Sequence, residues 1–212
     1  QGIYCQVDQA RCTCVVGHSM KLFKGVAEGF QPQITDWDAP SLRIFDNLEV
    51  EGRPTKGYGD STFNYAGKQY EPEPWTLKMS WLRERLQKFV KEEYGREVEF
   101  TFCLCALYET GATSVPHHSD TVPTSEDLVV GVSFGATRLF EWTQFETEIK
   151  RETNTSKTVY NLNSLECETR RYLLEDGDVY IFDGASQMYS THSIPSMEGV
   201  GERINLTFRS GI

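Results

Sequence analysis

The chain has 212 residues, which is enough for one domain with a substantial core but too few for two ordinary domains. Its hydrophobic content of 39% is typical of a globular protein, and no apolar run approaches the roughly 20 residues of a membrane-spanning helix. A formal net charge of −10 counts against tight, non-specific binding to long nucleic-acid duplexes, although it leaves room for a local basic strip.

The N-terminal third carries mixed signals. His18–Phe30 predicts a short helix and Ser41–Val50 a strand, whereas Gly52–Gly67 has no periodicity and predicts loops with a hairpin. Pro74–Tyr94 predicts the longest helix, because Pro suits a first turn and Gly95 suits a C-terminal stop. The expected apolar face of this helix consists of Leu77, Trp81, Leu82, Leu86, Phe89 and Val90.

After Gly95 the pattern changes to strands. Phe100–Tyr108 is apolar on both faces and predicts a buried strand, and further short candidates follow with turn signals between them. We therefore expect a mainly β protein with flanking helices (α+β), built as a double-stranded β-helix, or jelly roll. Residues 98–212 would form this core, and residues 1–97 an N-terminal helical and loop extension of the same compact domain. The further candidate strands are Leu128–Phe134, Thr137–Trp142, Lys157–Leu162, Thr169–Leu174, Val179–Phe182 and Arg203–Arg209.

Three potential metal ligands stand out because the chain has only four histidines. His118 and Asp120 are two residues apart, a spacing that places both side chains on one face of a strand, and His192 lies beside a predicted strand end. Two imidazoles and one carboxylate suit the face of an octahedral Fe(II) site that leaves positions open for a co-substrate and oxygen. For so short a motif, surface polar residues in a loop are the simpler alternative.

The C-terminal strand strengthens the case for a site. In Arg203–Arg209, the side chains of Arg203, Asn205, Thr207 and Arg209 point to one face. A buried strand with two arginines needs an anion, and a dicarboxylate offers two carboxylates for bidentate pairing. Alternation alone leaves open whether this face is buried or solvated.

From about Gly52 to Arg209 the sequence resembles the AlkB family of nucleic-acid dioxygenases. The matching motifs occur in order along the chain: Arg53-Pro-Thr, Tyr58-Gly-Asp60, Leu107-Tyr108, His118-Ser-Asp120, Ser133-Phe-Gly-Ala-Thr-Arg138, Gly177-Asp178, Gly184-Ala-Ser-Gln187, His192-Ser-Ile-Pro195 and Arg203-x-Asn-x-Thr-x-Arg209.

This resemblance implies an enzyme that uses Fe(II), 2-oxoglutarate and O2. It implies that His118, Asp120 and His192 bind iron and form the catalytic centre. It also implies that Arg203 pairs with the distal carboxylate of 2-oxoglutarate and that Arg209 and Asn205 hold the near end, with Tyr108 hydrogen-bonding the co-substrate. The implied reaction converts 2-oxoglutarate to succinate and CO2, hydroxylates an N-methyl group and releases formaldehyde.

The substrate side is less specified. The family's substrate loop would contain Tyr58, Asp60, Phe63 and Tyr65, and a base would need one of these aromatics to stack on. Tyr65 is the first choice, while ordinary packing is the alternative for each aromatic.

Two departures from the family pattern bear on function. Thr121 and Val122 stand where relatives often carry acidic residues, which leaves base selection open. Ala106 stands where the family tends to have Asn, which would remove one hydrogen bond to 2-oxoglutarate.

The remaining cysteines and histidines carry weaker signals. Cys5, Cys12, Cys14 and His18 lack standard zinc spacing, so free thiols are favoured over a zinc site. His117 would face away from the iron ligands on a strand. The scattered cysteines do not suggest a disulfide framework, and we expect an intracellular protein, in the cytoplasm rather than the nucleus.

The function that follows is oxidative demethylation of N-methylated bases, as in RNA demethylation or DNA repair. The acidic charge favours RNA or other single strands over duplex DNA as the partner, and no membrane contact is expected. The alternatives are an oxygenase that acts on a protein side chain and a non-catalytic binding module of the same fold. A chain that begins at Gln1 is also compatible with an AlkB-type domain within a larger polypeptide such as a plant-virus replicase.

Overall fold

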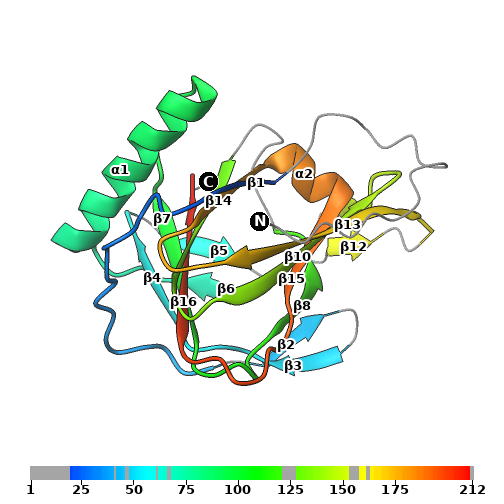
Figure 1. Ribbon diagram of the computed structural model, residues 1–212, viewed down its shortest axis with the longest axis horizontal. Helices are drawn as coiled ribbons and strands as arrows, with labels where there is room; N and C mark the ends of the chain where they lie inside the picture. The colour runs from blue at the N-terminus through cyan, green and yellow to red at the C-terminus, as the bar shows by residue number, and fades with distance from the viewer. Residues whose placement is uncertain are drawn as a thin grey trace.

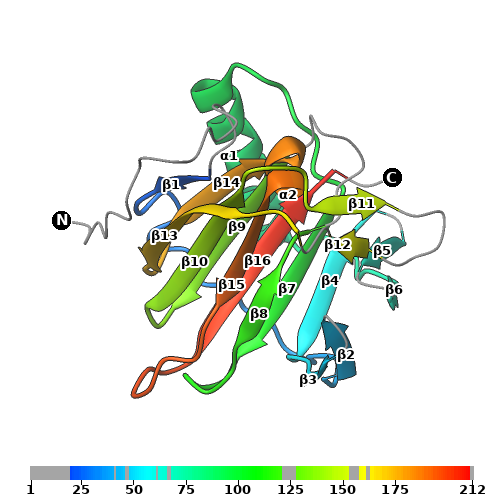
Figure 2. The same ribbon diagram turned by 90° about the vertical axis from the view of Figure 1, so that its right-hand side faces the viewer.

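Two antiparallel sheets lie face to face in the computed structural model (Figure 1), and their strands lie roughly alongside one another (Figure 2). The structure describes residues 20–40, 42–45, 48–60, 62–65, 68–120, 128–152, 158–160 and 163–210. The larger sheet contains, in spatial order, β1 (Lys21–Phe23), β14 (Val179–Asp183), β9 (Leu128–Gly135), β16 (Arg203–Arg209), β7 (Phe102–Tyr108) and β4 (Thr55–Gly59). The smaller sheet contains β13 (Glu166–Leu174), β10 (Arg138–Phe145), β15 (Ser190–Ile194) and β8 (Val115–His118). This arrangement confirms the predicted jelly-roll fold.

Three short hairpins and two helices accompany the two sheets in the described part of the chain. Three two-stranded hairpins pair β2 (Leu42–Phe45) with β3 (Leu48–Glu51), β5 (Phe63–Tyr65) with β6 (Lys68–Tyr70), and β11 (Lys150–Glu152) with β12 (Thr158–Tyr160). The helices are α1 (Leu77–Tyr94) and α2 (Gly184–Tyr189). No helix among the described residues is both long and apolar enough to cross a membrane.

The central strand β16 separates the core into two layers. Leu206 and Phe208 are fully buried against α1 in one hydrophobic cluster. The side chains at the alternate positions of β16 are also buried and face the smaller sheet; they are Arg203, Asn205, Thr207 and Arg209. The polar face that the sequence left unassigned therefore lies between the sheets, where an anion would be needed.

Helix α1 covers the outer face of the larger sheet (Figure 1). Thr76 caps its N-terminus by accepting a hydrogen bond from the backbone of Met79, so the helix starts three residues later than Pro74. Gly95 ends it with a positive φ of 64°, as predicted. Two residues of the expected apolar face are exposed instead, Leu77 at 92% and Trp81 at 51%.

The N-terminal predictions require correction. The predicted helix His18–Phe30 is wrong over its described part, where the edge strand β1 pairs with β14 and turns follow. Gly25 and Gly29 have φ of 65° and 81°, which interrupts a helix. The predicted strand Ser41–Val50 is the hairpin of β2 and β3. Gly52–Gly67, predicted as loops with a hairpin, also contains the sheet strand β4, which pairs with β7. Because β1 and β4 belong to the larger sheet, the first 97 residues also contribute to the jelly-roll core.

Asp178 fastens β1 to the turn between β13 and β14. Its carboxylate is 1% exposed and accepts hydrogen bonds from Lys24 Nζ at 2.5 Å and from the backbone nitrogens of Gly25 and Glu175 at 2.9 and 2.8 Å. Removing this carboxylate would take its acceptor from the backbone nitrogens of Gly25 and Glu175, whereas Lys24 would keep Glu175 and the carbonyl oxygen of Leu173 as partners.

We expect Asp178→Ala to lower the free energy of unfolding by about 2–4 kcal/mol, because two backbone nitrogens and Lys24 lose a buried, charged acceptor. Urea denaturation followed by circular dichroism measures the change. Lys88→Ala is the control, since Lys88 and Glu92 form an exposed pair at 3.8 Å and its loss should cost less than about 0.5 kcal/mol. Equal effects of the two variants would contradict this role of Asp178.

Candidate metal centre and anion pocket

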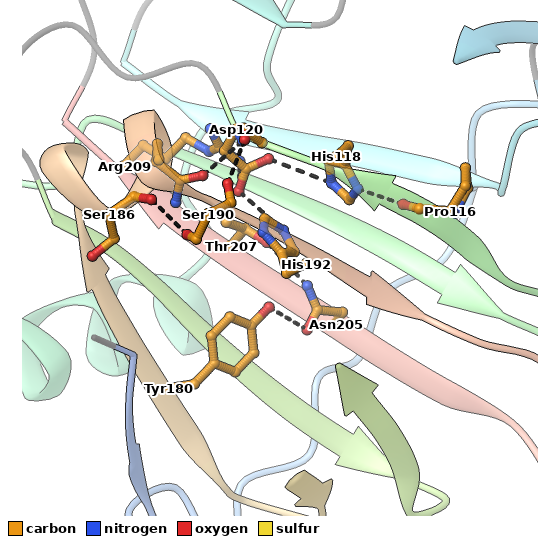
Figure 3. Close-up of polar contacts among 12 residues, drawn as sticks. Pro116, His118, Asp120, Tyr180, Ser186, Ser190, His192, Asn205, Thr207 and Arg209 are labelled. Atoms are coloured by element: carbon orange, nitrogen blue, oxygen red, sulfur yellow. Dashed lines mark hydrogen bonds and ion pairs between the residues drawn. The ribbon is translucent and has the colours of Figure 1, made fainter. Parts of the chain in front are cut away.

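Three ligand-type side chains converge beside the smaller sheet (Figure 3). His118 is the last residue of β8, Asp120 follows this strand, and His192 lies on β15. One Asp120 oxygen lies 3.7 Å from His118 Nε2, and the other lies 3.7 Å from His192 Nε2. One potential ligand atom from each residue lies within 4.8 Å of the others, a spacing in which one cation can contact all three.

Strand register brings the two histidines together. His192 is directly opposite His118 in the pairing of β15 with β8, and their ring centroids are 4.4 Å apart. Gln187 of α2 accepts a hydrogen bond of 2.8 Å from the backbone nitrogen of Asp120, which anchors the carboxylate just beyond the end of β8. The i, i+2 spacing thus brings His118 and Asp120 into one cluster, although β8 ends at His118 and Asp120 is not on the strand as predicted.

Both imidazoles are held in the form that binds metal. His118 Nδ1 lies 2.8 Å from the carbonyl oxygen of Pro116, which can only accept, so Nδ1 carries the proton and Nε2 faces Asp120 with its lone pair. Burial lowers the pKa of His118, and burial together with the neighbouring His118 lowers the pKa of His192 to about 3. Neutral imidazoles beside a carboxylate are the donor set expected for a divalent iron ion.

Two buried arginines of β16, with Asn205 between them, form a cationic cluster beside the metal cluster, which we call the anion pocket. Arg203 and Arg209 are 1% and 3% exposed. Arg209 Nη2 lies 3.0 Å from Asp120, which joins this pocket to the metal ligands. Arg203 donates to Ser133 Oγ at 2.7 Å and to Asn205 Oδ1 at 2.8 Å.

Arg203 retains unused hydrogen-bonding capacity. Its Nη1 is buried and has no hydrogen-bond partner among the described residues. A buried guanidinium nitrogen without an acceptor is unfavourable, and a carboxylate would satisfy it. The pocket therefore fits a dicarboxylate, and the neighbouring His–Asp–His donor set fits Fe(II).

Tyr108 is surrounded by guanidinium groups. The Cζ atoms of Arg53, Arg138 and Arg203 lie 4.7, 5.3 and 4.8 Å from the centroid of its ring, and Arg53 Nη1 donates a hydrogen bond to its hydroxyl. The hydroxyl can still donate to an anion while it accepts from Arg53. In the sequence Arg53 was noted only within a motif that matches the AlkB family, and its contact with Tyr108 was not predicted.

Arg138 has a structural role in this cluster. It is fully buried and donates to the backbone oxygens of Thr110, Gly111, Thr113 and Pro195 at 2.6–3.4 Å. These contacts join the loop after β7 to the segment after β15. Burial and the nearby Arg203 lower the pKa of Arg138.

Two of the four residues predicted for the substrate side, Tyr58 and Asp60, lie away from the metal cluster. Tyr58 is 6% exposed and packs in the cluster beneath α1, opposite Cys103 in the β4–β7 pairing, and burial raises its pKa. Asp60 is exposed and pairs with Arg83 of α1 at 3.3 Å. The side chains of Phe63 and Tyr65, at β5, lie outside the described part of the structure, so their role stays a prediction.

Two further expectations concern cysteine and histidine. Cys103 and Cys105 are free thiols and fully buried. His117 lies outside the metal cluster and faces Thr191 Oγ1 and Ser193 Oγ at 3.1 and 3.2 Å. The possible zinc ligands Cys5, Cys12, Cys14 and His18 lie outside the described residues.

Comparison with known proteins supports this chemistry. Residues 33–209 match the 2OG-Fe(II) oxygenase superfamily. Alpha-ketoglutarate-dependent dioxygenase alkB homolog 3 from Rattus norvegicus is 32% identical over 161 residues, which cover 74% of this chain and 50% of that protein. The Homo sapiens protein of the same name is 32% identical over 162 residues, which cover 74% of this chain and 51% of its own length. The chain thus spans about half the length of these relatives.

A solved structure supports the fold. OsALKBH1 superposes with a TM-score of 0.51 and covers 92% of this chain and 99% of its own, at 17% identity. At this identity the likeness concerns architecture alone. Membership of a larger viral polypeptide stays a prediction.

Proposed function

The chain belongs to the 2OG-Fe(II) oxygenase superfamily and is an AlkB-like dioxygenase, and from this premise we propose that it oxidatively demethylates N-methylated bases in nucleic acid. The observation that carries the proposal is the His–Asp–His cluster next to a buried arginine pair, in a chain that is 32% identical to an alkB homolog over 74% of the chain's own length. RNA and single-stranded DNA are the proposed substrates.

Each residue of the site has a defined task in this proposal. His118, Asp120 and His192 would hold Fe(II), and Arg203 would pair with the distal carboxylate of 2-oxoglutarate. When bound, the iron and co-substrate supply oxidising chemistry, in which O2 and 2-oxoglutarate yield succinate, CO2 and a hydroxylated N-methyl group that leaves as formaldehyde. The protein orients these partners and keeps the reaction away from bulk water.

The near end of the co-substrate would be held by two further residues of β16, Arg209 and Asn205. Arg209 already lies 3.0 Å from Asp120, so it is positioned beside the metal ligands. Tyr108 would donate its hydroxyl proton as a hydrogen bond to the co-substrate while Arg53 fixes the oxygen from the other side. This division of tasks matches the order of the residues along β16.

The acidic charge of the chain and its aromatic residues bear on which nucleic acid it selects. An acidic chain has little basic surface for a duplex, which favours single strands recognised by base stacking. Because Tyr58 is buried in the core, Tyr65 and Phe63 are the aromatics that we propose for this stacking. We also propose an intracellular, cytoplasmic location.

The test is mass spectrometry of short oligonucleotides incubated with protein, Fe(II), 2-oxoglutarate and ascorbate. RNA and DNA strands would carry N1-methyladenine, N3-methylcytosine or N6-methyladenine. We expect one strand to lose the mass of a methylene group only when 2-oxoglutarate is present. His118→Ala should abolish this loss, whereas the matched variant His117→Ala should retain it, because His117 lies outside the metal cluster.

Other outcomes would redirect the proposal. Succinate formation without any change in the oligonucleotides would indicate an oxygenase with another substrate, such as a protein side chain. Absence of both succinate and demethylation would favour a non-catalytic binding module.

A further inference from the structure

A glycine interrupts the inner face of the larger sheet. Gly131 lies in the middle of β9, where it pairs with Tyr180 of β14 on one side and with Thr207 of β16 on the other. A Cβ atom on Gly131 would lie 1.9 Å from Tyr180 Cζ and 2.3 Å from its hydroxyl oxygen. The tyrosine ring therefore lies directly over the glycine backbone, in space that any other residue would fill.

This gap lets Tyr180 reach across β9 to the anion pocket. Its hydroxyl donates a hydrogen bond of 3.1 Å to Asn205 Oδ1 (Figure 3). The same oxygen accepts from Arg203 Nη2 at 2.8 Å, and Asn205 Nδ2 donates to Thr207 Oγ1 at 3.0 Å. Two donors on Oδ1 fix the orientation of the amide, because the reversed amide would point its own donors at the Arg203 cation.

Neither residue paired with Asn205 on the two flanking strands donates a hydrogen bond to its amide oxygen. Ala106 of β7 is directly paired with Asn205 and offers only a methyl group. On the other flank, Ser133 of β9 pairs with Asn205 but its hydroxyl accepts from Arg203. Tyr180 is therefore the uncharged donor that holds the Asn205 amide.

The ring of Tyr180 is itself firmly placed. It packs against Phe140 and Phe182 with centroid separations of 5.2 and 5.9 Å, and both of these rings contact His192 at 5.5 and 5.2 Å. Burial raises the pKa of Tyr180, so the hydroxyl remains a donor at neutral pH. One aromatic cluster thus supports a metal ligand and a residue of the anion pocket.

We propose that Tyr180 is a positioning residue for 2-oxoglutarate: its hydroxyl, admitted by Gly131, orients the Asn205 amide so that the amide nitrogen faces the near end of the co-substrate. The role depends on 2-oxoglutarate binding and not on which molecule is oxidised. A test without nucleic acid therefore separates this inference from the proposed demethylation.

The experiment is calorimetric titration of 2-oxoglutarate into Mn(II)-loaded protein, for the wild type, Tyr180→Phe, Asn205→Ala and the double variant. Tyr180→Phe should weaken 2-oxoglutarate binding roughly 3- to 10-fold, the effect of one lost hydrogen bond, and leave Mn(II) binding unchanged. In the Asn205→Ala background the same change should have no further effect, because Tyr180 acts through Asn205. Tyr94→Phe is the matched control, since Tyr94 lies at the end of α1 beneath Lys21.

A second variant approaches the same contact from the other side. Gly131→Ala keeps the tyrosine but forces its ring away, so it should weaken 2-oxoglutarate binding to a similar extent. The proposal is overturned if Tyr180→Phe or Gly131→Ala binds 2-oxoglutarate like the wild type. Additive losses in the double variant would also overturn it, because they would show that Tyr180 acts independently of Asn205.

Discussion

Replacing Asp120 with asparagine is expected to lower the affinity for Fe(II) more than about 100-fold and to abolish succinate formation, since even outer partners of metal ligands contribute 10–100-fold. Asp120 is the one carboxylate in the His–Asp–His cluster, and its side chain is 3% exposed. Asparagine keeps the shape but removes the negative charge, and two neutral imidazoles then bind a divalent cation poorly.

A second effect of the same change follows from Arg209. Its Nη2 lies 3.0 Å from Asp120, and both side chains are buried. Without the negative charge of Asp120 this buried cation loses one charged partner, which should cost about 3–5 kcal/mol of folding free energy in the metal-free protein. Loss of metal affinity should therefore be accompanied by a lower melting temperature.

Anaerobic Fe(II) titration and differential scanning calorimetry measure the two effects. Asp36→Asn is the matched control: Asp36 is exposed in a loop and has φ of 54°, a conformation that asparagine also accepts. An Asp120→Asn protein that retained wild-type Fe(II) affinity would remove Asp120 from the ligand set.

The sequence was most informative where the pattern is long and regular. The alternation in Arg203–Arg209 predicted β16 with its observed bounds. The run after Pro74 predicted α1 with its observed end, but α1 starts at Leu77, three residues later than predicted. Alternation did not reveal which face of β16 is buried between the sheets, because this depends on α1 covering the other face. A pattern in one strand carries no information about its neighbours.

The elements that complete the metal site were harder to predict. β15, which carries His192, has the sequence Ser-Thr-His-Ser-Ile and lacks an alternating apolar pattern. α2 has six residues and gains its N-terminal cap from Asp183, too short a segment for a helical period to appear. The candidate iron ligands were thus predicted from residue chemistry and from the AlkB resemblance, whereas the short elements that carry them were not predicted.

Contacts between side chains of different strands were not predicted from the sequence. Tyr180 approaches Asn205 because β9 lies between β14 and β16 and presents a glycine at the crossing point. A glycine within the apolar run Leu128–Phe134 was the available signal, because such a glycine marks a close approach. Which side chain approaches depends on strand order, which short-range patterns do not encode.

The two buried arginines next to Tyr108 should respond to substitution in opposite ways. Arg138 donates to four backbone oxygens, although its own Nε has no hydrogen-bond partner among the described residues. Arg138→Met would remove these four hydrogen bonds and, in the described part of the chain, leave only the oxygens of Thr110 and Gly111 with a backbone donor, so it should destabilise the fold by about 3 kcal/mol or more. Arg203 has a buried Nη1 with no hydrogen-bond partner among the described residues, so its charge is poorly compensated in the ligand-free protein.

Arg203→Met should therefore leave the melting temperature of the ligand-free protein unchanged or raise it, because an apolar side chain replaces a buried, incompletely paired cation. The same change should raise the KM for 2-oxoglutarate roughly 100-fold, since the distal carboxylate loses charged hydrogen bonds of about 1.5–3 kcal/mol each. Thermal unfolding with and without 2-oxoglutarate in the presence of Mn(II) separates the two effects. We expect 2-oxoglutarate to stabilise the wild type and not the variant. If Arg203→Met unfolded like Arg138→Met, Arg203 would be a structural residue, and the anion pocket would have to be sought elsewhere in the protein.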